Sequence, residues 1–206
     1  MCAEMPSVIT TPPALEVPED FPIQGRYKGV MLPHIGPIHL WAAADAAELL
    51  DVPRYREEFT QKDELMPYWA DIWTSAYILA INFATGRIPL SGCHTALELG
   101  AGTGLPGLAL AKSGLQVTLT DFAEDALNIL KSHCRANGTE TVERTAARPL
   151  DILNPERTPD HLTGYDLVIG ADILFEYRMG EPLLETIDHC LHPDGEAIIA
   201  DPCRDT

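Results

Sequence analysis

One stretch, Thr95-Ala-Leu-Glu-Leu-Gly-Ala-Gly-Thr-Gly-Leu-Pro-Gly-Leu-Ala-Leu-Ala111, has the pattern of a buried strand, a glycine turn and the start of a helix. Its first five residues alternate as in a β-strand. Gly100, Gly102 and Gly104 let the backbone turn tightly and approach a ligand closely. Pro106 stands where the first turn of a helix tolerates proline. The stretch therefore predicts a nucleotide-type binding turn between a strand and a helix.

Two acidic side chains near this turn bear on the ligand. Gln116–Asp121 is a second β-prone run, and it ends in an acid where this architecture hydrogen-bonds the hydroxyls of a ribose. Gly102-x-Gly104-x-x-Gly107 also fits the dinucleotide fingerprint, with Asp121 at a spacing that suits NAD. Glu98 would repel a diphosphate, but it suits S-adenosylmethionine, which has no phosphate and carries an ammonium and a sulfonium. The sequence thus favours S-adenosylmethionine over NAD, and a turn without a ligand is a third interpretation.

The composition restricts the class of protein. A chain of 206 residues with 46% hydrophobic residues is long enough for one sizeable core. Fourteen Lys and Arg residues against 31 Asp and Glu residues give a net charge of −17, which opposes phosphate contacts. No apolar run reaches the roughly 18 to 20 residues of a membrane span. We therefore expect neither a nucleic-acid partner nor a membrane partner.

The five cysteines indicate the compartment. They are odd in number, contain no Cys-x-x-Cys and follow no secretory leader, so we expect reduced thiols and a cytoplasmic location. Two adjacent pairs, His133-Cys134 and His189-Cys190, suggest metal ligands. Each pair falls in a predicted helix, where neighbouring side chains diverge by about 100°. We therefore expect no metal site.

The chain divides into three predicted parts. Residues 1–22 contain five prolines and little apolar periodicity, which is typical of a flexible arm. Residues 23–206 form one predicted domain, in which 23–65 is an N-terminal extension with a β-hairpin and short helices. Residues 66–206 form a Rossmann-like core, a doubly wound α/β sheet in three layers, α/β/α. The later strands of this core are expected at Val142–Ala146, Leu167–Ala171 and Glu196–Ala200. The two strands of the hairpin in the extension are expected at Gln24–Leu32 and Ile35–Trp41.

An aromatic segment precedes the core sheet. Large aromatic residues at Tyr68, Trp69 and Trp73 stand directly before a helix predicted over Thr74–Ala84. We expect Tyr68 and Trp69 to line the channel of the second substrate and Trp73 to contact the cofactor. The alternative for either tryptophan is a structural anchor in the core.

Further candidate residues follow the ends of the later strands. Phe122 is placed to pack against an adenine ring, and Asp151 to accept a hydrogen from the adenine amino group, with a turn cap as the alternative. Asp172 and Phe175 follow the fourth strand. In open α/β sheets ligands bind at the carboxyl ends of strands where the connection order reverses. Asp172 is therefore the candidate catalytic or orienting residue, and Phe175 a wall of its pocket.

With these motifs placed, the chain resembles the class I, seven-β-strand S-adenosylmethionine-dependent methyltransferases from about residue 66 onward. Glu98-Leu-Gly-Ala-Gly-Thr-Gly104 matches their donor-binding motif, Asp121 their ribose acid and Asp151 their adenine-side acid. Three further segments are similar to non-histone protein-lysine methyltransferases, especially those of the electron-transfer-flavoprotein β subunit: Pro67–Ser75, Asp172-Ile-Leu-Phe175 and Ala200–Arg204. The resemblance implies an enzyme that methylates lysine in a protein substrate, with the Asp-x-x-Phe signature beside the accepting amine.

The sequence departs from this family in two ways. The family's sheet ends in an antiparallel hairpin, which is not visible here, so we expect the last strands to lie beyond residue 206. Phe175 stands where many relatives have tyrosine. This difference removes a hydroxyl that could orient an amine, so it bears on the identity of the substrate. Two alternatives for function also stay open, a small-molecule N-methyltransferase and a nucleoside-binding member of the fold without catalysis.

Overall fold

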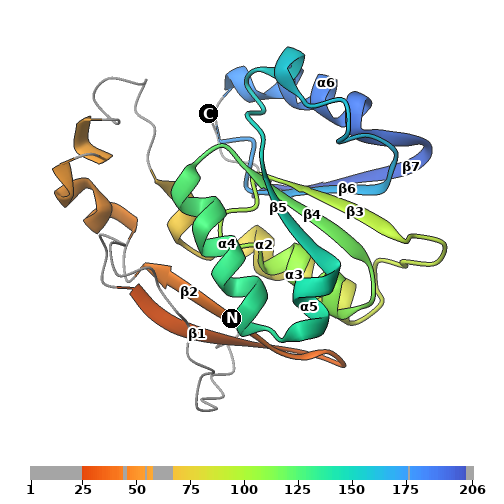
Figure 1. The fold of residues 1–206 in the computed structure, drawn as a ribbon, viewed down its shortest axis with the longest axis horizontal. Helices are drawn as coiled ribbons and strands as arrows, with labels where there is room; N and C mark the ends of the chain where they lie inside the picture. Colours follow the sequence, from red (N-terminus) through yellow and green to blue (C-terminus); the bar gives the residue numbers. More distant parts are fainter. Residues whose placement is uncertain (1–24, 44–45, 54, 58–66, 176, 203–206) are drawn as a thin grey trace.

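The computed structural model describes residues 25–43, 46–53, 55–57, 67–175 and 177–202. The predicted arm, 1–22, lies outside these ranges. The core is a five-stranded parallel sheet in the order β5-β4-β3-β6-β7 (Figure 1). The strands are β3 Thr95–Leu99, β4 Gln116–Asp121, β5 Thr145–Pro149, β6 Tyr165–Ala171 and β7 Leu191–Ala200. The chain moves outward from β3 to β5 and then returns to the other side of β3, so the connection order reverses between β3 and β6.

Helices cover both faces of this sheet, which gives the predicted three layers. Of the described helices, one group lies on one face of the sheet and another helix lies on the opposite face (Figure 1). The first group is α2 Thr74–Ala84, α3 Leu105–Lys112, α4 Glu124–Ala136 and α5 Thr139–Arg144, and the opposite helix is α6 Gly180–Cys190. Short 3-10 turns are η1 Ala46–Asp51, η2 Tyr68–Ala70, η3 Pro155–Arg157 and η4 Tyr177–Met179. Buried side chains form one cluster between the sheet and α2 and α3, and another beneath α6.

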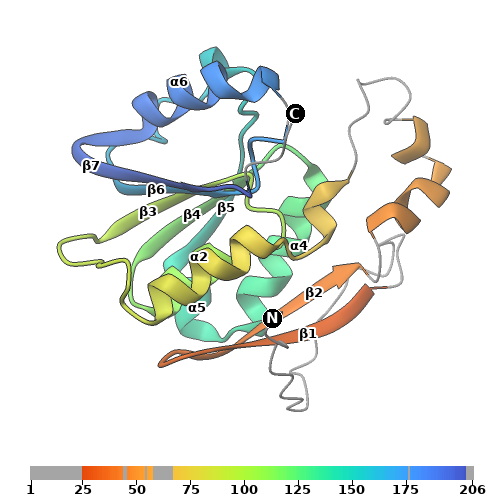
Figure 2. The ribbon, with the colours of Figure 1, turned by 180° about the vertical axis from the view of Figure 1, so that it is seen from behind.

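The N-terminal hairpin forms a separate antiparallel sheet of β1 Gly25–Leu32 and β2 Gly36–Ala43. It lies across the outer side of the helices α2 to α4 (Figure 2). Ile38 and Leu40 are fully buried in the same cluster as α3. This confirms the predicted hairpin and gives it a structural role as a cover for the helical layer.

Two predicted strand boundaries are wrong. Gly138, with a φ of 98°, reverses the chain after α4, and α5 then occupies residues that were expected to open the third strand. The hydroxyl of Thr145 donates to the carbonyl of Thr141 at 2.7 Å, so a helical turn persists until β5 begins. The strand expected at Glu196–Ala200 begins at Leu191 instead, as β7, and pairs with β6 through an irregular register. Of the predicted extension, 23–65, residues 23–24, 44–45, 54 and 58–65 lie outside the described ranges.

Candidate functional site

A cavity opens at the carboxyl ends of β3, β4 and β6, at the predicted point of reversal. Five acidic residues line it, and no Lys, Arg or His of the described ranges does. The acidic residues are Asp71, Glu98, Asp121, Asp151 and Asp172. The remaining lining is mainly apolar and aromatic, with backbone from the glycine turn. A cavity of this charge favours a cationic ligand over a phosphorylated one.

The glycine turn forms one side of the cavity with backbone in the left-handed region. Gly100 and Gly102 have φ values of 57° and 50°. A Cβ at Gly102 would lie 3.2 Å from the backbone of Trp69, and one at Gly100 would lie 2.8 Å from Ile173. Gly104 caps α3 with a φ of 76° and lies outside the cavity lining, so its role is to turn the chain into the helix. The packing therefore leaves no room for side chains at Gly100 and Gly102, and the turn presents bare backbone to the cavity.

Glu98 lies beneath this turn and is 2% exposed. Its Oε2 accepts a hydrogen bond from the backbone N–H of Gly107 at 2.9 Å. Burial raises the pKa of Glu98 to about 8, against the lowering effect of the Gly107 bond, and the nearby Asp121 adds to the rise. The carboxyl is therefore largely protonated at neutral pH, and a cation that enters the cavity would favour its ionised form.

Asp121 holds the turn from the end of β4. Its Oδ2 accepts from the N–H of Gly102 at 3.0 Å, and its Oδ1 accepts from the N–H of Ala123 at 3.0 Å. Burial raises the pKa of Asp121, and these backbone bonds oppose the rise. The adjacent Phe122 is 56% exposed and lines the cavity. An acid next to an exposed ring suits a ribose and its base.

Asp151 is exposed and lines the cavity. Its Oδ1 accepts from the N–H of Leu153 at 3.0 Å, and its Oδ2 accepts from the side-chain amide of Asn154 at 2.6 Å. The turn-cap alternative is thus present in the structure. The carboxylate also lines the cavity, next to Leu150 and Ile152, so the predicted adenine contact stays a prediction.

Asp172 lies on the opposite side of the cavity, at the end of β6. Its backbone is left-handed, with a φ of 57°, and its N–H donates to the carbonyl of Ala200 at 2.9 Å. Its Oδ2 accepts from the N–H of Ser75 at 3.2 Å, in the first turn of α2. The N-terminus of a helix stabilises a negative charge. The fold therefore holds this buried carboxylate towards the cavity.

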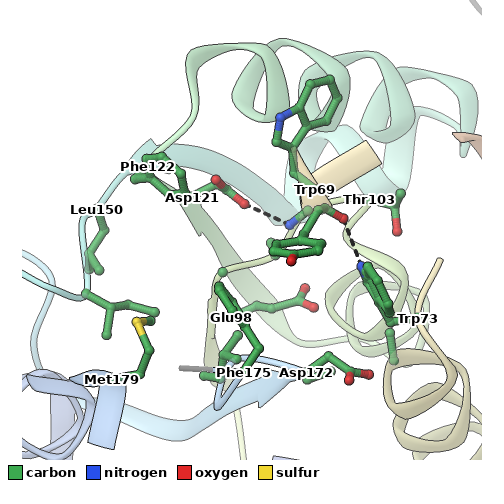
Figure 3. A pocket seen from close by; sticks show the side chains of 18 of the residues that line it. Trp69, Trp73, Glu98, Thr103, Asp121, Phe122, Leu150, Asp172, Phe175 and Met179 are labelled. Carbon is green, nitrogen blue, oxygen red and sulfur yellow. Dashed lines mark hydrogen bonds between the residues drawn. The ribbon is translucent and has the colours of Figure 1, made fainter. Parts of the chain in front are cut away.

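Three aromatic rings pack against one another in the lining of the cavity that also includes Asp172. The ring centre of Tyr68 is 5.1 Å from that of Phe175 and 5.6 Å from that of Trp73. The indole N–H of Trp73 donates to the carbonyl of Tyr68 at 2.8 Å, which fixes the segment. Figure 3 shows Trp73, Phe175 and Asp172 along one side of the cavity, away from Phe122. Rings around a carboxylate suit an alkylammonium group.

Trp69 packs in the core and also lines the cavity. Its side chain is 8% exposed and packs in a cluster with Trp41, Tyr55 and Ile129. Figure 3 shows its indole directed away from Asp172 and Phe175. The core-anchor interpretation therefore holds for its side chain, and the predicted contact with the second substrate stays a prediction.

The cavity includes residues that sequence reasoning missed. Thr103, Ile173 and Met179 line it, and none of them has a chemical signature that would single it out. His133 was considered only as part of a metal pair, but it is fully buried and contacts the carbonyl of Thr103. No group of three or more potential metal ligands occurs in the described part of the chain. None of the helices described there is long and apolar enough to span a membrane.

Comparison with known proteins now identifies the family. The lysine methyltransferase family matches residues 60–205. The chain belongs to this family. Protein N-lysine methyltransferase METTL21A of Mus musculus is 34% identical over 142 residues, which are 66% of this chain and 60% of that protein. The Danio rerio protein of the same name is 30% identical over 185 residues, 86% of this chain and 78% of that protein.

The fold also matches solved methyltransferases. The glycopeptide N-methyltransferase MtfA superimposes with a TM-score of 0.51 at 20% identity, over 63% of this chain and 54% of that one. The predicted Rossmann-like methyltransferase sheet is confirmed. The sequence match spans less than two thirds of the length of the mouse relative.

The cofactor of this family is S-adenosylmethionine, and the residues of the cavity fit it. The glycine turn presents bare backbone to the cavity, and the lining is acidic without a basic side chain from the described residues. Asp121 would hold the ribose, Phe122 and Asp151 the adenine, and Glu98 the ammonium group.

Proposed function

We propose that this protein transfers a methyl group from S-adenosylmethionine to the side-chain amine of a lysine in a protein substrate. The proposal rests mainly on Asp172 and the three rings of Tyr68, Trp73 and Phe175, which adjoin one another on one side of the cavity. Asp172, Trp73 and Phe175 lie away from Phe122, on the side of the cavity opposite the one expected to hold the adenine (Figure 3). The family match to lysine methyltransferases supports the same acceptor.

The acceptor amine must lose its proton before it can react. The reference pKa of lysine, near 10.4, implies a cost of roughly 4 to 5 kcal/mol for a neutral amine at neutral pH. Apolar rings lower this cost because they displace water from the ammonium. Asp172 orients the neutral amine by accepting a hydrogen bond from it. The rings favour the cationic product by on the order of 0.5 to 2 kcal/mol, so the pocket balances two opposing demands.

The cofactor supplies a methyl group that is activated by a positive sulfur. No covalent intermediate with the protein is required, so this chain mainly aligns the acceptor and excludes water. The aromatic segment contributes its rings and α2 its N-terminal N–H group. Asp172 therefore acts through position and charge.

We further propose a cytoplasmic location and no nucleic-acid partner. The three cysteines in the described ranges, Cys93, Cys134 and Cys190, are free thiols, which supports a reducing compartment. A net charge of −17 disfavours phosphate backbones.

Transfer of radiolabelled methyl groups into proteins of a cell extract tests the function. We expect label in protein, recovered as methyl-lysine after hydrolysis, and about a 10²-fold lower rate with Asp172→Asn. Asp188→Asn, on an exposed position of α6, is the matched control and should retain activity. Label that appears only in small molecules would favour the small-molecule alternative. An absence of any transfer would favour the non-catalytic alternative.

A further inference from the structure

Two side chains of α4 hold strand β2 as a neighbouring strand would. The amide of Asn137 accepts from the N–H of His39 at 2.9 Å and donates to the carbonyl of His39 at 2.8 Å. One turn earlier, His133 Nε2 accepts from the N–H of Trp41 at 2.8 Å. His39 and Trp41 are two residues apart in a strand, so their backbone groups face the same side. The helix thus binds the hairpin through specific polar contacts as well as through apolar packing.

The other ring nitrogen of His133 reaches the glycine turn. Nδ1 lies 2.8 Å from the carbonyl oxygen of Thr103, which lines the cavity. A backbone N–H can only donate, so Nε2 must be the acceptor for Trp41. Nδ1 therefore carries the hydrogen and donates a hydrogen bond to the carbonyl oxygen of Thr103. The side chain is fully buried, and burial lowers its pKa to about 4, which keeps the ring neutral.

The turn is consequently held at two successive residues by different elements. Asp121 of β4 accepts from the N–H of Gly102, while His133 of α4 donates to the carbonyl of Thr103. The hydrogen bond to Asp121 ties Gly102 to the sheet. The ring that holds Thr103 also accepts, through its other nitrogen, a hydrogen bond from the N–H of Trp41 in the hairpin. One neutral ring thus links the outer hairpin to the cavity wall.

We infer that His133 is a positioning residue that couples the N-terminal hairpin to the glycine turn and so sets the affinity of the cavity for its adenosyl ligand. The inference rests on the proposed donor site but not on the identity of the acceptor. Coupling between two sites is reciprocal in binding free energy. Ligand in the cavity should therefore stabilise the hairpin, and a loosened hairpin should weaken ligand binding.

Two substitutions separate the two hydrogen bonds of the ring. His133→Gln places an amide near the position of Nε2, so it keeps an acceptor for Trp41 and loses the donor to Thr103. His133→Asn places its amide near Nδ1, so it keeps the donor and loses the acceptor. Both variants break the connection between the hairpin and the glycine turn. Only the glutamine variant removes the hydrogen bond to Thr103 of the turn itself. His189→Gln, at an exposed position of α6, is the matched control.

Hydrogen exchange with and without saturating S-adenosylhomocysteine tests the coupling. In the wild type and in His189→Gln, we expect the ligand to slow amide exchange in the hairpin peptide that contains Trp41. Both His133 variants should lose this protection. Calorimetry should show about a fivefold higher Kd for the ligand with His133→Gln and a smaller rise with His133→Asn.

The outcomes distinguish this inference from the proposed function. Ligand that binds the wild type without slowing exchange in the hairpin would overturn the coupling, as would protection that persists in both His133 variants. This wild-type comparison decides the matter even if a variant fails to fold. A wild type that binds no ligand at all would instead overturn the proposed function.

Discussion

Asp172 combines a strained backbone with a charge-stabilising contact. Its φ of 57° is unusual for a residue with a Cβ, although Asp and Asn tolerate this region better than most. The N–H of Ser75 compensates by donating to its carboxylate. The residue with the unfavourable backbone conformation is therefore the same one whose carboxylate the proposed reaction uses.

Substitution at Asp172 should separate its structural role from its chemical one. Asp172→Asn keeps an acceptor for Ser75 and tolerates the left-handed backbone, so its free energy of unfolding should stay close to that of the wild type. Asp172→Ala loses both features and should be less stable by about 1 to 2 kcal/mol. Urea denaturation measures both values. Equal stability of the two variants would contradict the proposed contact.

Glu98 should make the stability of the fold depend on pH. The pKa of Glu98 is about 8 in the folded protein, against an ordinary value of 4.5. The stability that its protonated form contributes is therefore fully present below about pH 4.5. The contribution is lost as pH rises through about 8. The Glu98 contribution to the free energy of unfolding should therefore fall between about pH 5 and about pH 9, while His133, with its lowered pKa, adds a rise that ends near pH 6.5. In Glu98→Gln the fall in the free energy of unfolding should be smaller, with the remainder due to groups such as Asp121.

Urea denaturation across this pH range provides the measurement. The amide of glutamine can still accept from Gly107, so the variant is a close structural match. Parallel curves for the wild type and the variant would show that Glu98 titrates in the same way in the folded and unfolded states. That result would contradict the burial of an acid beneath the glycine turn.

At the scale of elements, the aromatic segment before α2 and the loop after β6 form the proposed acceptor pocket together. Phe175 contacts Tyr68, and Tyr68 contacts Trp73. Phe175→Leu should raise the KM for a lysine peptide by about threefold to tenfold because a cation–ring contact is lost. Phe175→Tyr should change it by less than about twofold, since the ring remains. The KM for S-adenosylmethionine is the internal control. Two variants with equal KM values would argue against a ring contact.

The elements also show what the sequence could predict. The helix over Thr74–Ala84 and the strand Gln116–Asp121 have the expected bounds, because local patterns determine both. The start of β5 was misplaced because a short helix after Gly138 has no strong periodicity of its own. The location of Asp172 at the cavity could be predicted from its position directly after a strand. The role of His133 could not, since its partners Trp41 and Thr103 are distant in sequence and both are backbone groups.

At the scale of the whole molecule, the negative charge extends into the cavity. The chain carries a net charge of −17, and four acidic residues line the site besides the largely protonated Glu98. A lysine peptide with basic neighbours should therefore be attracted over a distance of about one Debye length, roughly 10 Å at moderate salt. Raising the salt concentration should increase the KM for such a peptide severalfold and leave kcat nearly unchanged. A KM that is independent of salt would show that this field does not guide the substrate.

A crystal structure with bound S-adenosylhomocysteine tests the central claim most directly, because it places the donor side and the acceptor side of the cavity at once. The account predicts that the ribose contacts Asp121, that the adenine lies by Phe122, and that the sulfur faces the space between Asp172 and the rings of Tyr68 and Phe175. A product molecule bound elsewhere, or one whose sulfur points away from Asp172, would contradict the account.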